Sequence, residues 1–203
     1  IPHPDQESWM METQVTQALY RAVTGESPSR FKGDQLPVEN VSWRDGIVFC
    51  NALSKKLGLK PAYKGTNHNC KLIRSANGFR LPFVAEWAFA AKAGQNFKYA
   101  GSDNLKEVGW YNGRFGGKVT NGQTQPVAQL KPNGYGLYDM SGNVWEWCAD
   151  NYDNTVASLR AACGGSCGNS KYDVYGCEVS SSKRFSPGGR RDDLGLRLCR
   201  SLG

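Results

Sequence analysis

Several groups of residues in this chain have types that could support catalysis, and the first is a serine set among glycines. Residues 164–168 read Gly-Gly-Ser-Cys-Gly, which matches the G-x-S-x-G turn that presents a serine nucleophile in hydrolases. In that arrangement the histidine base follows the serine, whereas His3 and His68, the two histidines of the chain, both precede it. A serine hydrolase is therefore not predicted. Two isolated histidines also cannot supply the histidine cluster of an iron site.

Cysteines are the second group that could act as nucleophiles or metal ligands. The seven lie at positions 50, 70, 148, 163, 167, 177 and 199. Their spacing does not match the paired C-x2–4-C knuckles of zinc sites, and a disulfide framework would leave one thiol over. Cys50, Cys70 and Cys148 stand in apolar contexts, which predicts buried thiols that pack as small hydrophobic side chains.

Two acids form the third group, because they lie inside an apolar run. The stretch Asn133–Trp147 reads NGYGLYDMSGNVWEW and includes Asp139 and Glu146. A buried carboxylate needs a partner, which can be a hard cation or a set of backbone N–H groups. The Asn133-Gly134 pair at its start predicts a turn, since both residue types tolerate positive φ.

Helical periodicity predicts the elements that position these residues. The first helix is expected over residues 11–23. A second follows Ser42, which forms a capping box with Asp45, and ends at Gly58. A third begins at Pro82 and ends at Gly94. Residues 159–166 and 194–199 are predicted to be short strands, and residues 95–132 show no helical period.

Composition limits the classes of protein to which this chain can belong. With 203 residues, 39% hydrophobic content and no internal repeat, residues 1–203 are predicted to form one domain. No run of ~18 apolar residues occurs, so no transmembrane segment is predicted. The net charge of +7 comes from scattered Lys and Arg residues without a nucleic-acid-binding motif, so no nucleic-acid partner is expected. We expect a monomer. Because the chain begins at Ile1, we also consider a lipid anchor that has been lost from the N-terminus.

The stretch Asn133–Trp147 and the phrase GFRLPFVAEW at Gly78–Trp87 resemble the signatures of formylglycine-generating-enzyme-like domains, also called sulfatase-modifying factors. This resemblance covers nearly the whole chain. It implies a branch of the C-type lectin fold, an α+β domain that is loop-rich, with two to three helices around short antiparallel strands. The N-terminus is shorter than the family pattern, which puts the first strand in doubt. The resemblance further implies a structural calcium ion held by Asp139, Gly142, Val144 and Glu146.

The same resemblance argues against the activity of the family's enzymes. Alignment on Gly164–Ser166 and Leu194–Arg197 places the two catalytic cysteine positions on Asn169 and Val174. Neither residue can act as a thiolate nucleophile or bind copper. The chain is therefore predicted not to be an enzyme, with no copper and no organic cofactor.

The C-terminal segment, about residues 158–200, resembles the variable proteins of diversity-generating retroelements, of the treponemal surface lipoprotein type. Cys177, Pro187, Arg190 and Leu194-Gly195 fit the fixed positions of that pattern, and the rest is rich in Tyr, Ser, Gly and Asp, as in antibody-like binding loops. The resemblance implies a non-enzymatic protein at the cell surface or outside the cell, which binds a protein or other macromolecular ligand. Carbohydrate binding is not predicted, because the E-P-N and Q-P-D motifs of calcium-dependent lectins are absent.

The residues expected to contact this ligand are Asn169, Lys171, Tyr172, Asp173, Tyr175, Lys183, Arg184, Phe185, Ser186, Gly189, Arg191, Asp192 and Asp193. An alternative remains open. The chain could be an inactive or differently specialised formylglycine-generating-enzyme-like domain with a fixed binding or enzymatic role.

Overall fold

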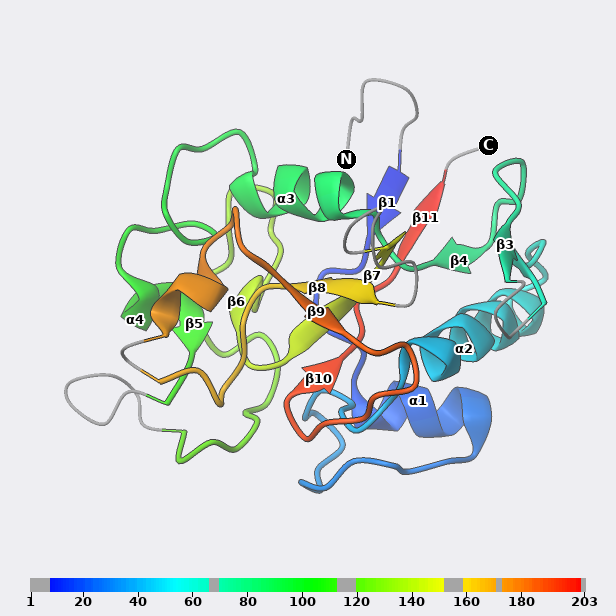
Figure 1. Cartoon of the computed structure of the whole chain (residues 1–203), viewed down its shortest axis with the longest axis horizontal. Coiled ribbons are helices and arrows are strands. Elements are labelled where there is room, and N and C mark those ends of the chain that lie inside the picture. Colours follow the sequence, from blue (N-terminus) through cyan, green and yellow to red (C-terminus); the bar gives the residue numbers. More distant parts are fainter. Residues whose placement is uncertain (1–7, 66–69, 113–119, 152–158, 171–172, 202–203) are drawn as a thin grey trace.

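The structure is a computed structural model that describes residues 8–65, 70–112, 120–151, 159–170 and 173–201 (Figure 1). Its helices are α1 (Gln17–Thr24), α2 (Trp43–Lys56), α3 (Val84–Lys92), the short α4 (Leu105–Val108) and the 3-10 turn η1 (Val174–Cys177). The strands are β1 (Ser8–Met10), β2 (Tyr63–Lys64), β3 (Lys71–Leu72), β4 (Phe79–Arg80), β5 (Gly109–Trp110), β6 (Ser141–Gly142), β7 (Trp145–Asn151), β8 (Arg160–Cys163), β9 (Ser182–Phe185), β10 (Leu194–Gly195) and β11 (Cys199–Ser201). Much of the remaining chain is irregular, so the predicted α+β, loop-rich class is confirmed.

A four-stranded sheet in the order β10-β7-β8-β9 is the centre of the fold, and β9 is one of its edges. A second sheet has the order β1-β11-β4, and β2-β3 and β5-β6 form two short pairs. The central sheet is mixed, because β7 pairs with β10 in parallel and with β8 antiparallel. The β5-β6 pair is parallel. The expectation of antiparallel strands is corrected at these two places.

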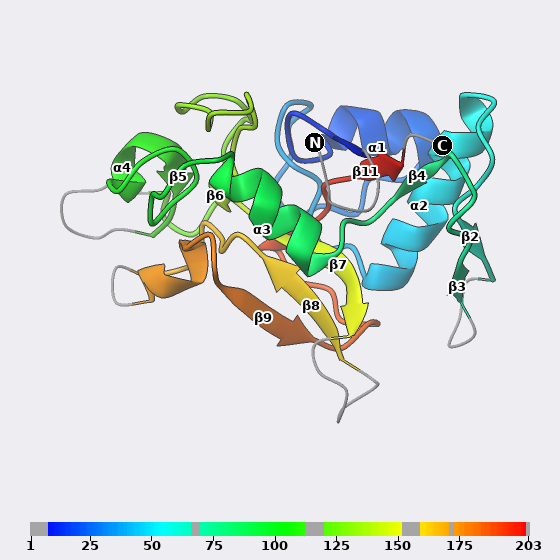
Figure 2. The same cartoon turned by 90° about the horizontal axis from the view of Figure 1, so that it is seen from above.

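The two faces of the central sheet belong to different core clusters, because side chains alternate along a strand. Trp145 and Trp147 of β7 pack with Tyr20 of α1 and Ile47 of α2. Cys148, on the opposite face of β7, packs with α3 and with alternate residues of β8. Figure 2 shows α3 on one side of this sheet and β9 along its free edge.

The N-terminal segment differs from its prediction. Residues 11–16 are not helical; Met11 N donates to Leu198 O at 2.9 Å and Val15 N to Leu196 O at 2.8 Å. The first helix begins only at Gln17, after Thr16 caps it by accepting from Leu19 N. Pairing with the C-terminal strand segment thus overrides the helical periodicity of residues 11–16. The doubtful first strand does form, since β1 pairs with β11.

The other predicted elements lie close to their expected places. The capping box of Ser42 and Asp45 starts α2, and α3 starts two residues after Pro82. The strand predicted over residues 194–199 is split into β10 and β11, which belong to different sheets. The one-turn helices α4 and η1 were not predicted, because a single turn is too short to show a helical period.

We predict that Trp147→Ala lowers the free energy of unfolding by about 3–5 kcal/mol, the usual cost of removing a buried aromatic side chain. Trp147 is fully buried, donates from Nε1 to Val41 O at 3.0 Å and packs against Phe185. The matched control is Trp9→Ala, since Trp9 is 62% exposed. Urea unfolding followed by circular dichroism measures both. Equal losses in the two variants would contradict the packing described.

Candidate ligand-binding face

The C-terminal segment builds a surface against the indole of Trp145, a buried residue of β7. A Cβ on Gly176, in η1, would lie 3.0 Å from the Trp145 ring, so η1 runs directly beside it. From β9, the Lys183 ammonium lies 5.6 Å from the ring centroid, and the Phe185 ring packs edge-on at 6.2 Å. Trp145 therefore supports two parts of the predicted variable segment at once.

We call the surface formed by the exposed and partly exposed predicted contact residues the variable face. It consists of Asp173, Tyr175, Lys183, Arg184, Phe185, Ser186, Gly189, Arg191 and Asp192. Tyr175 is 64% exposed, with the Lys98 ammonium 5.3 Å from its ring centroid. The Arg191 guanidinium lies 5.8 Å from the Phe185 centroid. Tyr and Arg are the residue types that most often anchor protein interfaces.

Arg184 lies on the opposite side of β9 from Lys183 and Phe185, because consecutive strand residues alternate. Its register partner is Ala161, which belongs to the core cluster that packs on α3. Since β9 is an edge strand, both of its sides border the free edge of the sheet. The variable face thus wraps around this edge.

Four predicted contact residues need separate treatment. Asn169 is buried, where its Oδ1 accepts from Ser166 N at 2.8 Å. Asp193 is also buried, and its Oδ2 accepts from Ser166 Oγ at 2.9 Å. Both side chains hydrogen-bond to Ser166 inside the protein. The expectation that they contact the ligand is therefore corrected. Lys171 and Tyr172 lie outside the described residues.

A shallow groove of about 520 Å³ adjoins the variable face and includes residues that sequence reasoning missed. Arg30, Asn40 and Arg190 line it together with Arg191 and Asp192. Arg30 forms an ion pair with Asp192, across a large separation in the chain that no sequence pattern marks. The groove therefore combines predicted variable residues with a loop that precedes α2.

A separate group of buried polar side chains, which we call the Glu146 cluster, consists of Gln14, Trp87, Glu146 and Arg197. The Glu146 carboxylate accepts four hydrogen bonds. Arg197 donates from Nε and Nη2, each at 2.9 Å, Trp87 from Nε1 at 2.6 Å and Gln14 from Nε2 at 3.0 Å. Both members of the ion pair are fully buried. The acid is thus satisfied by side chains from other parts of the fold.

The four residues predicted to bind calcium are Asp139, Gly142, Val144 and Glu146, and the structure brings them together. Oxygens of all four converge on the Gln14 amide nitrogen. Asp139 contributes its backbone carbonyl there, while its carboxylate accepts from Ala128 N at 2.8 Å. Burial raises the pKa of this carboxyl to about 6. The oxygens suit calcium, but a hydrogen-bond donor holds their centre, so calcium does not fit the site as it is built.

The two positions that align with catalytic cysteines offer no nucleophile. Asn169 is hydrogen-bonded within its loop, and Val174 packs against a small apolar cluster. The nearby thiols of Cys167 and Cys177 are buried, and burial raises the pKa of Cys177 to about 12 and that of Cys167 as well. A thiol with such a raised pKa is a poor nucleophile at neutral pH.

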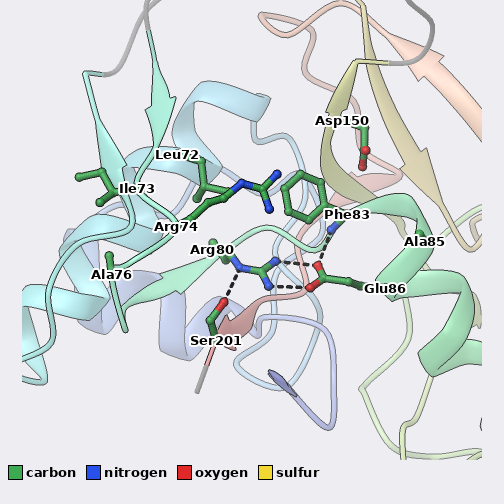
Figure 3. A pocket seen from close by; sticks show the side chains of 10 residues that line it. All are labelled: Leu72, Ile73, Arg74, Ala76, Arg80, Phe83, Ala85, Glu86, Asp150 and Ser201. Atoms are coloured by element: carbon green, nitrogen blue, oxygen red, sulfur yellow. Dashed lines mark hydrogen bonds and ion pairs between the residues drawn. The ribbon is translucent and has the colours of Figure 1, made fainter. Parts of the chain in front are cut away.

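A separate cavity of about 470 Å³ lies between β4, the start of α3 and the end of β7 (Figure 3). In its wall, Arg80 forms two 2.6 Å contacts with Glu86 and donates to Ser201 Oγ at 3.1 Å. None of the described residues of the variable face lines this cavity. We therefore place the candidate binding site on the variable face instead.

The fold is the one expected of formylglycine-generating-enzyme-like domains. The family model described as sulfatase-modifying factor enzyme 1-like domain matches residues 6–202, so the chain belongs to this family.

Three similar proteins illustrate the range of the family. Treponema denticola variable protein 1 is 34% identical, covers 96% of this chain and 84% of its own, and superposes with a TM-score of 0.88. Chaperone protein LppX of Paenibacillus barcinonensis is 40% identical across 93% of this chain and 78% of its own length. Inactive C-alpha-formylglycine-generating enzyme 2 of Mus musculus is 29% identical across 93% of this chain and 57% of its own length. Proteins named formylglycine-generating enzyme are also similar. Among the described residues, no helix is long and apolar enough to span a membrane.

Residues 39–40 hold the base of the variable face. Glu39 pairs with Gly195 by a backbone bridge, and Asn40 N donates to Arg191 O at 2.7 Å. The Glu39 side chain is fully buried, with Oε1 accepting from Phe31 N at 3.0 Å. Burial raises the pKa of its carboxyl from 4.5 to about 7.

We predict that Glu39→Gln stabilises the protein more at about pH 8 than at about pH 5, by on the order of 2–3 kcal/mol. Because the pKa of Glu39 is higher in the folded state, the folded state holds the proton more tightly. Wild-type stability therefore falls as the pH rises from 4.5 to about 7. The stability of the Glu39→Gln variant does not fall in this way, because the glutamine side chain does not titrate. Urea unfolding at both pH values measures the difference, and parallel pH profiles for the two proteins would contradict the assignment.

Proposed function

We propose that this protein is a non-enzymatic binder, which presents a retroelement-diversified surface on a formylglycine-generating-enzyme-like scaffold. The proposal rests on a difference in burial between neighbouring parts of the C-terminal segment. Predicted variable side chains such as Tyr175 and Lys183 are exposed, whereas Leu194, Leu196 and Arg197 just after them are buried. A surface of this kind can change sequence while its support stays constant.

The chemistry of the variable face supports a protein or other macromolecular ligand. Its aromatic and cationic side chains, Tyr175, Phe185 and Arg191, are exposed or partly exposed, and none of the three lines the cavity between β4 and α3. Such side chains supply contact area at low entropic cost. The similarity to a variable protein from Treponema supports display at the cell surface. We also propose that the protein is a monomer and has no nucleic-acid partner.

The absence of a nucleophile at the two aligned positions supports a non-enzymatic role. Asn169 and Val174 cannot replace thiolates, and the nearby Cys167 and Cys177 thiols are buried. The similarity to an inactive member of the family is consistent with this interpretation.

A fixed binding role is the second candidate function. It is favoured by the 40% identity to a protein named as a chaperone. Such a protein would recognise one partner with invariant residues, whereas a diversified binder would differ between cells at the variable face. The two candidates therefore differ in the gene as well as in the protein.

We predict that the DNA near this gene contains a near-copy of the codons for about residues 158–200, beside a reverse transcriptase. The copy should differ from the gene where the copy has adenine, at codons of the variable face. Sequencing the locus in a clonal population, and again after many generations, measures this. Changes should appear at Lys183 and Arg191 but not at the buried Leu194 or Leu196.

A single invariant copy without a template would contradict diversification and leave the fixed binder. The matched control is the codon set of α2, which is not expected to vary. Variation spread equally over both regions would indicate ordinary drift.

A further inference from the structure

The oxygen cage around Gln14 has the composition of a cation site but a different centre. Four oxygens lie within hydrogen-bonding distance of one amide nitrogen. Gln14 Nε2 is 3.0 Å from Val144 O, 3.0 Å from Glu146 Oε1, 3.2 Å from Asp139 O and 3.3 Å from Gly142 O. Gln14 is fully buried. A group surrounded in this way must carry positive charge or N–H donors, because oxygens would otherwise repel one another.

The orientation of the Gln14 amide follows from these oxygens. Its Nε2 has two hydrogens for four acceptors, so the hydrogen bonds are shared. Its Oε1 is buried without a hydrogen-bond partner among the described residues. Rotating the amide by 180° would satisfy nothing, because Oε1 would then face four oxygens. The opposite orientation is stable only with a cation between them.

Arg197 supplies the positive charge that balances the buried Glu146 carboxylate. Its guanidinium is fully buried and forms an ion pair with this carboxylate. Its remaining N–H groups donate to the carbonyls of Met11 and Glu12, each at 2.9 Å, and Tyr138, at 2.6 Å. All five guanidinium donors are thus used. Arg197 thus joins the loop before β7 to the N-terminal segment.

We propose that the Gln14 amide replaces a calcium ion at this site, so that the scaffold of the variable face is assembled independently of metal. Gln14 occupies the place of the cation among the oxygens, and Arg197 balances the charge of Glu146. This inference concerns the scaffold and holds whichever ligand the protein binds.

The first test uses the wild-type protein and calcium alone as the probe. After treatment with EDTA, the melting temperature is measured without metal and with about 10 mM calcium, above the Kd of even weak extracellular sites, about 10⁻⁴–10⁻³ M. We expect the two melting temperatures to agree within about 1 °C. A rise of several degrees with calcium, or one calcium ion per chain in equilibrium dialysis, would overturn the proposal.

The second test converts the amide into a carboxylate. Gln14→Glu places an acid among the four oxygens, so the metal-free variant should melt lower than wild type and calcium should raise its melting temperature. The matched control is Gln17→Glu. Gln17 is also buried and its Nε2 donates to the carbonyls of Phe31, at 2.8 Å, and Pro37, at 3.3 Å.

Calcium should not raise the melting temperature of Gln17→Glu. The acceptors of the Gln17 amide are two backbone carbonyls, and no carboxylate is among them. Rescue confined to Gln14→Glu supports the placement of the amide at the cation position. An equal calcium response in the two variants, or none in either, would overturn it.

Discussion

The buried ion pair of Glu146 and Arg197 is the interaction on which the arrangement of this protein depends. Glu146 lies in the first half of β7, and Arg197 lies between β10 and β11. Their contact joins the central sheet to the end of the chain, and Arg197 also holds the carbonyls of Met11 and Glu12. A buried carboxylate without these donors would be strongly unfavourable, since breaking such a pair costs about 3–5 kcal/mol. The pair therefore fixes how the N-terminal segment, the central loop and the C-terminal strands meet.

This constraint explains how a variable surface and a constant scaffold can share one segment. The residues that make the ion pair and the adjoining core are buried, and the chain leaves the core between Val179 and Asp193 to form β9 and its flanking loops. Side chains there rest on Trp145 from outside. Substitution of an exposed side chain usually changes stability by less than ~0.5 kcal/mol, whereas substitutions in a buried network cost several times more. Freedom to vary follows from position in the fold.

Much of the fold could be predicted from the sequence, because its signals are local. The capping box of Ser42 and Asp45 marks the start of α2, and the motif Asn133–Trp147 identifies the family. The long-range contacts could not be predicted. Nothing near Gln14 indicates that its amide contacts a loop more than a hundred residues away. The helical periodicity of residues 11–23 predicted a helix at this position instead. Composition suggested exposed contacts throughout the variable segment, but Asn169 is buried because its side chain closes a loop, which only the tertiary structure reveals.

Burial, and not position in the chain, decides which residues of the C-terminal segment can change. A saturation substitution scan of residues 159–201, with resistance to proteolysis as the measure of folding, tests it directly. We expect most substitutions to be tolerated at the exposed residues Tyr175, Lys183, Ser186 and Arg191. Few should be tolerated at the buried residues Cys177, Leu196 and Arg197. Tolerance that shows no relation to burial, or loss of folding at the exposed positions, would contradict it.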